Sequence, residues 1–508
     1  MASIEITSIA EERPGTAAGK AGGSQELVEK SSRNIHRQVI GLFAANVLTI
    51  LAIGFSFIAY SRLLSPPEFG LYAVALSTAT LLALILDGGL KTTIIKSETN
   101  LPREEESSIA VLMVLVSFGL ILALLAVQQP ILALRPEIKH DTKFVVLFVG
   151  IALLFYPFVT LPTAKLEREL KYGHIAWIES LGTIVERGGP ALLLLFTKSG
   201  IYSFVWALLA SRVLRAVILA TFHAVRLTAG SWAGFSNSLR HLREGAWIQV
   251  GTVSSVIRDN LHTLLVGPFF GKEWIGYYAW AFQICLVSSQ VFAQISARVS
   301  LPLLAQAKGF QERWSRCLYQ VRLLAMLTVP LLCGVWLVLP TMNYHFFRGK
   351  WQPALAILPL LFLRMVPGIA TTPIGPLIMV QRGGRSFAKV SLFWTLAEIA
   401  GASLLLFALG PSGLAWSCAV MVWVGLWFML IALGQNPLDL GKQLIAGLLR
   451  HPSFSFLVPA TLVLSTVGKS RLAPEVNPVL PVMVACLLVA VSILLEPDLR
   501  RLLTHEKK

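Results

Sequence analysis

The stretch PPEFGLYAVALS at residues 66–77 has a partial copy further along the chain, GKEWIGYYAWAFQ at residues 271–283. With an offset of about 206 residues, Gly70 and Tyr72 align with Gly276 and Tyr278, and two alanines align with two alanines. Chance is the alternative explanation, because Gly, Tyr and Ala are common where a helix enters a membrane interface. Both copies follow one apolar stretch and open the next, which favours a true internal repeat.

Apolar stretches of about 20 residues recur from Val39 to Leu495, and each is long enough to cross a bilayer as a helix. Hydrophobic residues make up 55% of the chain and charged residues only 14%, a composition typical of membrane proteins. Because six stretches separate the two copies, the halves are expected to run parallel. The predicted fold class is an all-α integral membrane protein with about fourteen transmembrane helices, two parallel six-helix lobes around a central cavity and a C-terminal helix pair.

The net charge is +16, and most Lys and Arg residues fall in the loops that would be cytoplasmic if the N-terminus lies inside. This distribution predicts that both termini lie in the cytoplasm, and it argues against nucleic acid as a partner. The predicted segments are a disordered tail (1–38), an N-terminal six-helix lobe (39–221), a basic cytoplasmic link (222–244), a C-terminal six-helix lobe (245–433), an additional helix pair (434–496) and a cytoplasmic tail (497–508).

The sequence offers little support for an enzyme. It has no large polar block outside the apolar stretches, no long outer loop and no Ser/His/Asp arrangement. The five cysteines are scattered without CxxC or Cys/His spacing, so they predict neither a disulfide framework nor a metal site. We therefore expect no catalytic residues, no metal ligands and no cofactor.

Charged residues lie inside several of the apolar stretches. In IVERGGPALLLLF (184–196), Glu186 and Arg187 precede two glycines and a proline. A charged side chain at the centre of a membrane helix costs about 2.5–3.5 kcal/mol, so both side chains must face protein or water. Arg258, Asp259 and Asn260 stand together halfway through another stretch. Arg364 lies in a stretch with four prolines that predicts a bent or broken helix.

Two explanations of these charges stay open. Each carboxylate can pair with an arginine of a neighbouring helix and only stabilise the bundle. Alternatively, the arginines face a shared aqueous cavity, where their planar guanidinium groups suit the oxygens of a diphosphate. The candidate substrate-binding residues are Arg258, Asp259, Asn260, Arg364, Arg187, Glu186, Arg298 and Arg212, and the candidates for coupling to a proton or sodium gradient are Asp87, Asp259 and Glu398. His262 is interpreted as a hydrogen-bonded helix histidine.

Three stretches carry a resemblance to a known family: SRLLSPPEFGLYAVALSTATLLALILDGGLKTTIIK, TAKLERELKYGHIAWIES and IRDNLHTLLVGPFFGKEWIGYYAWAFQI. In these stretches the chain resembles the oligosaccharide flippase, or polysaccharide transporter, family of the multidrug/oligosaccharidyl-lipid/polysaccharide exporter superfamily. In the third stretch the family pattern corresponds to Arg258, Asp259, Asn260, Gly267, Gly271, Gly276 and Tyr278. The sequence departs from typical members at Glu186 and Arg187, where apolar residues are more usual.

The resemblance implies two six-helix lobes around a hydrophilic cavity. It also implies translocation of a polyprenyl-diphosphate-linked oligosaccharide across the bacterial inner membrane for O-antigen, capsule or exopolysaccharide synthesis. The implied partners are the lipid-linked oligosaccharide, membrane lipids and, further, a polysaccharide polymerase and glycosyltransferases. The alternative is a cation-coupled drug exporter of the same superfamily. Such exporters usually carry a carboxylate in the first span, whereas residues 39–60 contain no charge. A membrane enzyme and a non-transporting assembly partner are the remaining alternatives.

Overall fold

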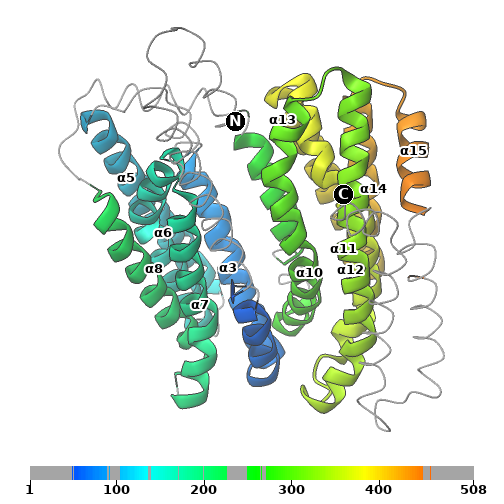
Figure 1. Cartoon of the computed structure of the whole chain (residues 1–508). Helices are drawn as coiled ribbons and strands as arrows, with labels where there is room; N and C mark the ends of the chain where they lie inside the picture. Colours follow the sequence, from blue (N-terminus) through cyan, green and yellow to red (C-terminus); the bar gives the residue numbers. More distant parts are fainter. Residues whose placement is uncertain are drawn as a thin grey trace, which may run out of the picture.

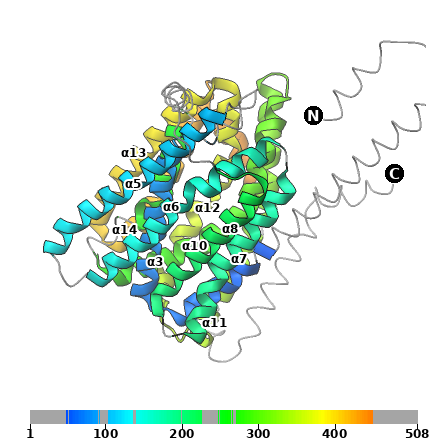
Figure 2. The same ribbon diagram turned by 90° about the vertical axis from the view of Figure 1, so that its left-hand side faces the viewer.

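The computed structural model describes residues 51–88, 103–134, 139–169, 171–197, 199–225, 249–263 and 270–449, with a few isolated positions besides. These residues form helices packed into two groups (Figure 1). Figure 2 views the molecule from the side of the first group, and the helices of both groups run in broadly the same direction. The all-α fold predicted from the sequence is therefore confirmed.

The first group, here called the N-lobe, comes from the first half of the chain. Ser65 caps α3, because its backbone N–H and its hydroxyl both donate to Glu68 Oε2, at 2.9 and 2.7 Å. Pro66 then fills the first helical position, where the missing N–H costs nothing. The helices of the N-lobe are Leu51–Leu63, α3 (Pro66–Asp87), α5 (Arg103–Leu134), α6 (Lys139–Arg168), α7 (Tyr172–Phe196) and α8 (Ser203–Phe222), with a short 3-10 turn at Gly200–Tyr202.

The second group, the C-lobe, begins with the helix at residues 249–263. It continues with α10 (Lys272–Ala305), α11 (Phe310–His345), α12 (Gln352–Arg382), α13 (Gly384–Leu409), α14 (Pro411–Ala432) and α15 (Pro437–Leu449). Of the two outcomes expected around Arg364, a bent or a broken helix, the break is wrong, because α12 is one continuous helix with four prolines inside it. Its neighbours pack closely enough to hold the helix together despite the backbone hydrogen bonds that proline cannot make. The bend stays a prediction.

Within the described residues, eight helices are long and apolar enough to cross a membrane. Large apolar side chains are exposed around the outside, for example Phe196, Leu404 and Phe407, which are 82%, 71% and 74% exposed. Such a belt of exposed apolar side chains is expected where a helix bundle faces lipid.

The two copies of the sequence repeat meet at the point where α3 crosses α10. A Cβ built on Gly70 would lie 2.7 Å from Gly276 N and 2.8 Å from Lys272 O, and one built on Gly276 would lie 1.8 Å from Pro66 O. The contact is reciprocal, since Gly70 aligns with Gly276 and Pro66 aligns with Lys272. Reciprocal contacts between equivalent residues are characteristic of a two-fold axis. The crossing therefore supports two halves related by a pseudo-two-fold axis.

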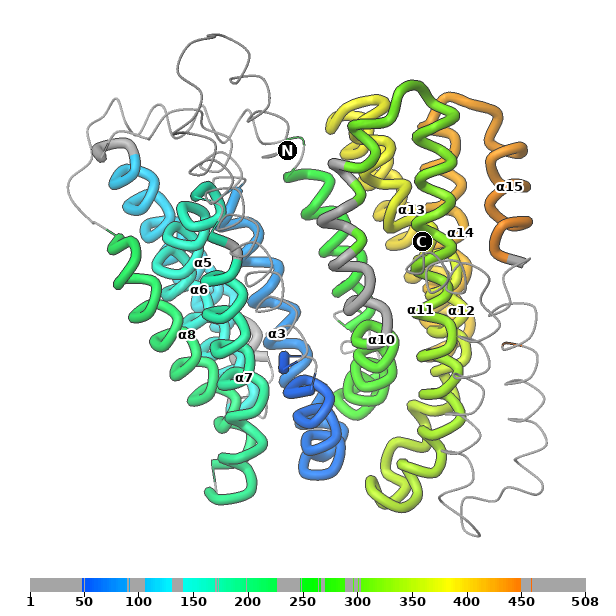
Figure 3. The backbone as a smooth tube through the Cα atoms, in the orientation of Figure 1, coloured from blue at the N-terminus to red at the C-terminus, as the bar shows by residue number. Residues whose placement is uncertain are grey.

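The lobes are also joined by hydrogen bonds near this crossing. Trp280 Nε1 donates to Ser61 Oγ at 2.7 Å, and Trp351 Nε1 donates to Ser61 O at 2.8 Å. Lys350 Nζ donates to the carbonyl oxygens of Arg62 and Leu64, each at 2.7 Å. Figure 3 shows α3 and α10 approaching each other at this end and diverging toward the other. We call this set of contacts the interlobe clamp.

Several predicted segments fall outside the described residues: the tail at 1–38, most of the link at 222–244, most of the additional helix pair at 434–496 and the tail at 497–508. The proposed segment boundaries stay predictions. Only α15 represents the C-terminal addition, and it packs on the C-lobe through Leu440, Leu444 and Leu448.

Candidate functional site

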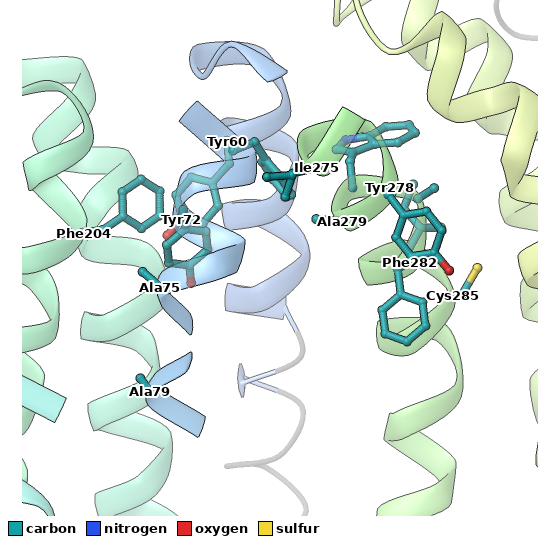
Figure 4. Close-up of a cluster of buried hydrophobic side chains, with 14 of the residues drawn as sticks. Tyr60, Tyr72, Ala75, Ala79, Phe204, Ile275, Tyr278, Ala279, Phe282 and Cys285 are labelled. Atoms are coloured by element: carbon teal, nitrogen blue, oxygen red, sulfur yellow. The ribbon is translucent and has the colours of Figure 1, made fainter. Parts of the chain in front are cut away.

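Three neighbouring cavities lie along the facing surfaces of the lobes. The central cavity, of about 290 Å³, is bounded by the helix Leu51–Leu63, α3, the helix 249–263 and α10. A second cavity of about 280 Å³ shares Leu76, Thr80 and Val256 with it and extends into the N-lobe. A third of about 220 Å³ shares Asp259 and Leu286 with it and extends into the C-lobe. Figure 4 shows the aromatic side chains of α3 and α10 near the central cavity.

The C-lobe cavity is lined by two of the predicted arginines. Arg364 Nη2 donates to Asp259 Oδ1 at 2.8 Å, and its guanidinium carbon lies 4.9 Å from the centre of the Phe282 ring. The Arg364 side chain is 9% exposed, whereas the Asp259 side chain is 46% exposed. Asp259 also lines the central cavity, so it stands at the boundary between the two spaces.

Arg258 lines the same cavity but is held differently. Its guanidinium stacks on Trp394, with the carbon 3.6 Å from the ring centre, and Arg258 Nε lies 3.9 Å from Glu398 Oε2. The residue is 7% exposed, and its Nη1 is buried without a partner. Arg258 makes no hydrogen bond to any residue that the structure describes, although guanidinium offers five donors. A buried guanidinium in this state retains most of its capacity to bind an anion.

Glu398 lies behind Arg258, away from the cavity lining. His262 Nε2 and Glu398 Oε1 are 2.9 Å apart, in agreement with the interpretation of His262 as a hydrogen-bonded histidine. Tyr278 Oη and Cys418 Sγ lie 2.8 Å apart beside them. His262, Glu398 and Cys418 bring three metal-ligating atoms within 4.8 Å of one another. Arg364 Nη1 is 4.0 Å from the Cys418 sulfur, so a guanidinium already occupies the side where it would repel a metal cation.

Three charged residues of the N-lobe form one cluster that stabilises the lobe, whereas Arg187 faces the central cavity. Glu186 accepts from Arg215 Nη1 at 3.2 Å and lies 3.9 Å from Arg212. Arg215 further donates to Thr183 Oγ1 at 3.0 Å. A Cβ on Gly182 would lie 1.8 Å from Arg215 Nε, so this glycine makes room for the guanidinium.

Arg187 does not pair with its neighbour Glu186 in the chain. Arg187 Nη1 donates to Tyr72 Oη at 2.8 Å, and Tyr60 Oη donates to the Arg187 carbonyl. Arg187 lines the central cavity, whereas Glu186 and Arg212 line the N-lobe cavity. Within the described residues, Arg187 has no carboxylate within 4 Å.

The structure brings some of the predicted site residues together and leaves others apart. The C-lobe cavity holds Arg258, Asp259 and Arg364, and the central cavity holds Arg187, Asp259 and Asn260. Asp87 is buried at the end of α3 and lines none of the three cavities. The backbone of Arg298 lies in α10, but its side chain is outside the described part of the structure. For Arg364 both explanations of the buried charges hold. It pairs with Asp259, and it also lines the C-lobe cavity.

Sequence reasoning missed several residues that shape the cavities: Tyr72, Gln283 and Trp394. In the sequence Tyr72 stands out only as part of the internal repeat, and in the structure it accepts the Arg187 hydrogen bond. For Gln283 a signal was available, because an amide inside a membrane helix marks a functional residue by default. Trp394 carried no such signal in a chain with thirteen tryptophans.

Residues 59–356, more than half of the chain, match the family described as "Polysaccharide biosynthesis protein". The chain is 23% identical over 332 residues to the teichuronic acid biosynthesis protein TuaB of Bacillus subtilis, covering 62% of this chain and 66% of that one. It is 24% identical over 340 residues to the succinoglycan biosynthesis transport protein ExoT of Rhizobium meliloti, covering 66% of each. An uncharacterized membrane protein of the cps region of Klebsiella pneumoniae is 22% identical, covering 66% of this chain and 70% of that one.

The fold is similar to two solved membrane transporters. The lipid II flippase MurJ in an inward closed conformation superposes with a TM-score of 0.68 at 14% identity, covering 90% of this chain and 97% of MurJ. An inward-facing multidrug resistance MATE family transporter gives a TM-score of 0.55 at 15% identity, covering 79% and 95%. The repeat, the paired lobes and the family match lead to one conclusion: the chain is a multi-pass membrane protein that belongs to the polysaccharide biosynthesis protein family.

Proposed function

We propose that the protein is a flippase that moves a polyprenyl-diphosphate-linked oligosaccharide across the bacterial inner membrane for O-antigen, capsule or exopolysaccharide synthesis. The observation that carries the proposal is the state of Arg258, a buried guanidinium that borders a cavity without a hydrogen bond to any described residue. Burying a charged donor in this way is costly unless a ligand or water takes its hydrogens. A diphosphate supplies such acceptors.

The charges along the three cavities also suit a diphosphate. Among the described residues that line them, four are arginines (Arg187, Arg212, Arg258 and Arg364) and two are carboxylates (Glu186 and Asp259). These groups leave a net charge of +2, and a diphosphate diester carries about two negative charges. The half-exposed Asp259 carboxylate is the group that the ligand displaces from Arg364, because it already stands at the boundary of two cavities.

The interlobe clamp gives this site a direction of access. The turn before α3 lies outside if the N-terminus is cytoplasmic, as the basic loops favour. The clamp at Ser61, Lys350 and Trp351 then closes the outer end, and the ligand enters from the cytoplasmic side. Alternating access follows when the clamp opens and the opposite ends of the lobes approach. On this proposal both termini are cytoplasmic, and the partners are membrane lipids, a polysaccharide polymerase and glycosyltransferases.

Glu398 is the proposed group for coupling to a proton gradient. It is 1% exposed and bonded to His262, and its Oε2 lies 3.9 Å from Arg258 Nε. Protonating Glu398 removes the negative charge beside Arg258, which strengthens the attraction of that guanidinium for a diphosphate. Proton binding and substrate binding then favour each other. Lipid binding should therefore tighten as the pH falls, and Glu398→Gln should make it independent of pH.

Reconstitution into liposomes tests the flippase proposal. Fluorescent undecaprenyl diphosphate carrying a sugar is compared with a cationic dye, which represents the alternative of a drug exporter. Arg258→Gln should slow flipping about tenfold or more, because charge-assisted hydrogen bonds contribute roughly 1.5–3 kcal/mol each. Arg316→Gln is the matched control, since Arg316 pairs with Glu312 at the start of α11 and lines none of the three cavities. Export of the dye without movement of the lipid would reject the proposal.

A further inference from the structure

We propose that the central cavity binds the sugar next to the diphosphate, and that the side-chain amides of Gln283 and Asn260 form hydrogen bonds to its hydroxyl groups. This inference deepens the proposed function and rests on it. The two amides come from different elements of the C-lobe, α10 and the helix 249–263, and both line the same cavity of about 290 Å³.

The amide of Gln283 is open to the cavity. It makes no hydrogen bond to any residue that the structure describes, and the side chain is only half-buried. Asn260 donates one hydrogen to the Val256 carbonyl at 2.8 Å, which leaves its oxygen and its second hydrogen available. An unpaired amide within a membrane helix is expensive unless a ligand or water satisfies it. One unpaired amide and one amide with free capacity in the same cavity indicate a polar ligand rather than a packing requirement.

Several hydroxyl groups around the cavity already have their hydrogens engaged. Ser56 donates to the Ala52 carbonyl at 2.6 Å, and Thr80 donates to the Leu76 carbonyl at 2.8 Å. Their oxygens are left as acceptors. The amides add free donors to those of Arg187, and each amide presents a donor and an acceptor in one plane. A sugar hydroxyl, which both donates and accepts, matches this arrangement.

Most of the remaining lining of the cavity is aromatic and apolar, with the hydroxyls of Ser77 and Thr263 beside it. Phe57, Tyr60, Tyr72 and Phe282 contribute to it. A pyranose ring has one apolar C–H face and a rim of hydroxyls, so aromatic walls with a few converging amides suit it. The volume lies near the lower end of the range for small-ligand pockets, about 300–1,000 Å³, which suits one or two sugar units and not a long glycan.

The position of the cavity fits the covalent order of the substrate. Asp259 and Leu286 line both the central cavity and the C-lobe cavity that holds Arg258 and Arg364. A diphosphate bound by these arginines places its attached sugar across this boundary. Arg187, on the far wall, is held by Tyr72 and closes the sugar site from the N-lobe side.

Binding measurements in lipid nanodiscs separate the sugar contribution from the diphosphate contribution. The probes are undecaprenyl diphosphate and its glucosyl, galactosyl and N-acetylglucosaminyl derivatives. The unmodified protein should bind at least one sugar-bearing lipid more tightly than the sugar-free lipid. Gln283→Leu combined with Asn260→Leu should reduce that preference about tenfold, as expected for the loss of two hydrogen bonds. Arg258→Gln should weaken binding of sugar-bearing and sugar-free lipids alike.

Gln320→Leu is the control for removing an amide from a membrane helix. Gln320 is buried in α11 and accepts from Ser300 at 2.8 Å, outside all three cavities, so this change should lower the yield of folded protein without altering the preference. If the unmodified protein shows no preference for any sugar-bearing lipid, or if the double variant keeps the preference, the sugar site is refuted while the flippase proposal stands. If none of the four lipids binds, the proposed function itself fails.

Discussion

Substituting Gly276 by alanine should separate the lobes at the point where α3 crosses α10. The added Cβ would lie 1.8 Å from the Pro66 carbonyl oxygen and 2.5 Å from its carbon, whereas ordinary contacts begin at 3.4 Å. The obstructing atoms belong to the backbone, so no side-chain rotation relieves the overlap. The two helices must move apart, which loosens the interlobe clamp beside them.

The magnitude follows from the cost of overpacking, about 1–3 kcal/mol for a methyl group forced into a closely packed site. At about 1.4 kcal/mol for each tenfold change, the closed state of this end becomes roughly 5- to 150-fold less favoured. The reciprocal change Gly70→Ala should act in the same direction with a smaller effect, because its nearest atoms are 2.7 and 2.8 Å away.

Hydrogen–deuterium exchange in nanodiscs measures this opening. Amides at residues 61–72 and 272–280 should exchange faster in Gly276→Ala, while those of α13 and α14 should not change. Gly150→Ala is the matched control, because Gly150 lies inside α6 with nothing within 4 Å of its added Cβ. It should be neutral or slightly stabilising, since alanine favours a helix over glycine by about 1 kcal/mol. Exchange unchanged in Gly276→Ala, or equal acceleration in Gly150→Ala, would refute the account of the crossing.

Three further predictions concern stability and assembly of the lobes. Arg215→Met should lower the stability of the N-lobe by about 3–5 kcal/mol, because it leaves Glu186 buried without its nearest partner. Adding Glu186→Gln to the same chain should restore part of the loss. Thermal unfolding in detergent measures both effects. Ser61→Ala should weaken the interlobe clamp by about 1–2 kcal/mol, because the Trp280 indole N–H loses its acceptor. Hydrogen–deuterium exchange at residues 272–280 should then become faster. Unchanged exchange there would show that this hydrogen bond contributes nothing. The Lys171 ammonium donates to Glu169 and keeps the pKa of that carboxyl below its usual range. The stabilisation by the ionised Glu169 is therefore present at neutral pH and is lost as the pH falls through the folded-state pKa. The melting temperatures of the unmodified protein and of Glu169→Gln should differ at neutral pH and converge in acid.

The architecture could be predicted because it depends on local and repeated signals. Hydrophobic length fixed the helices, and the Gly70/Gly276 correspondence indicated the parallel halves before any contact was known. The cluster around Arg258 could not be resolved in the same way. Its partner Glu398 is far away in the sequence, and only the packing of α13 against the helix at 249–263 brings the two together.

The adjacent pair Glu186 and Arg187 shows the limit of sequence reasoning most clearly. Successive residues on a helix point about 100° apart, so the two side chains enter different environments. One joins Arg215 inside the lobe, and the other reaches Tyr72 at the central cavity. The four prolines do not interrupt α12, because tertiary packing stabilises a helix that local preference would interrupt.

The reciprocal glycine crossing has a genetic consequence. A methyl group at either position collides with a main-chain oxygen or nitrogen of the other half, and no substitution changes those atoms. Second-site suppressors of Gly276→Ala should therefore be absent from the opposing residue Pro66. They should instead arise where the helix ends are anchored, at positions such as Ser65, Glu68 and Asp141, whose loss lets α3 or α10 shift as a whole.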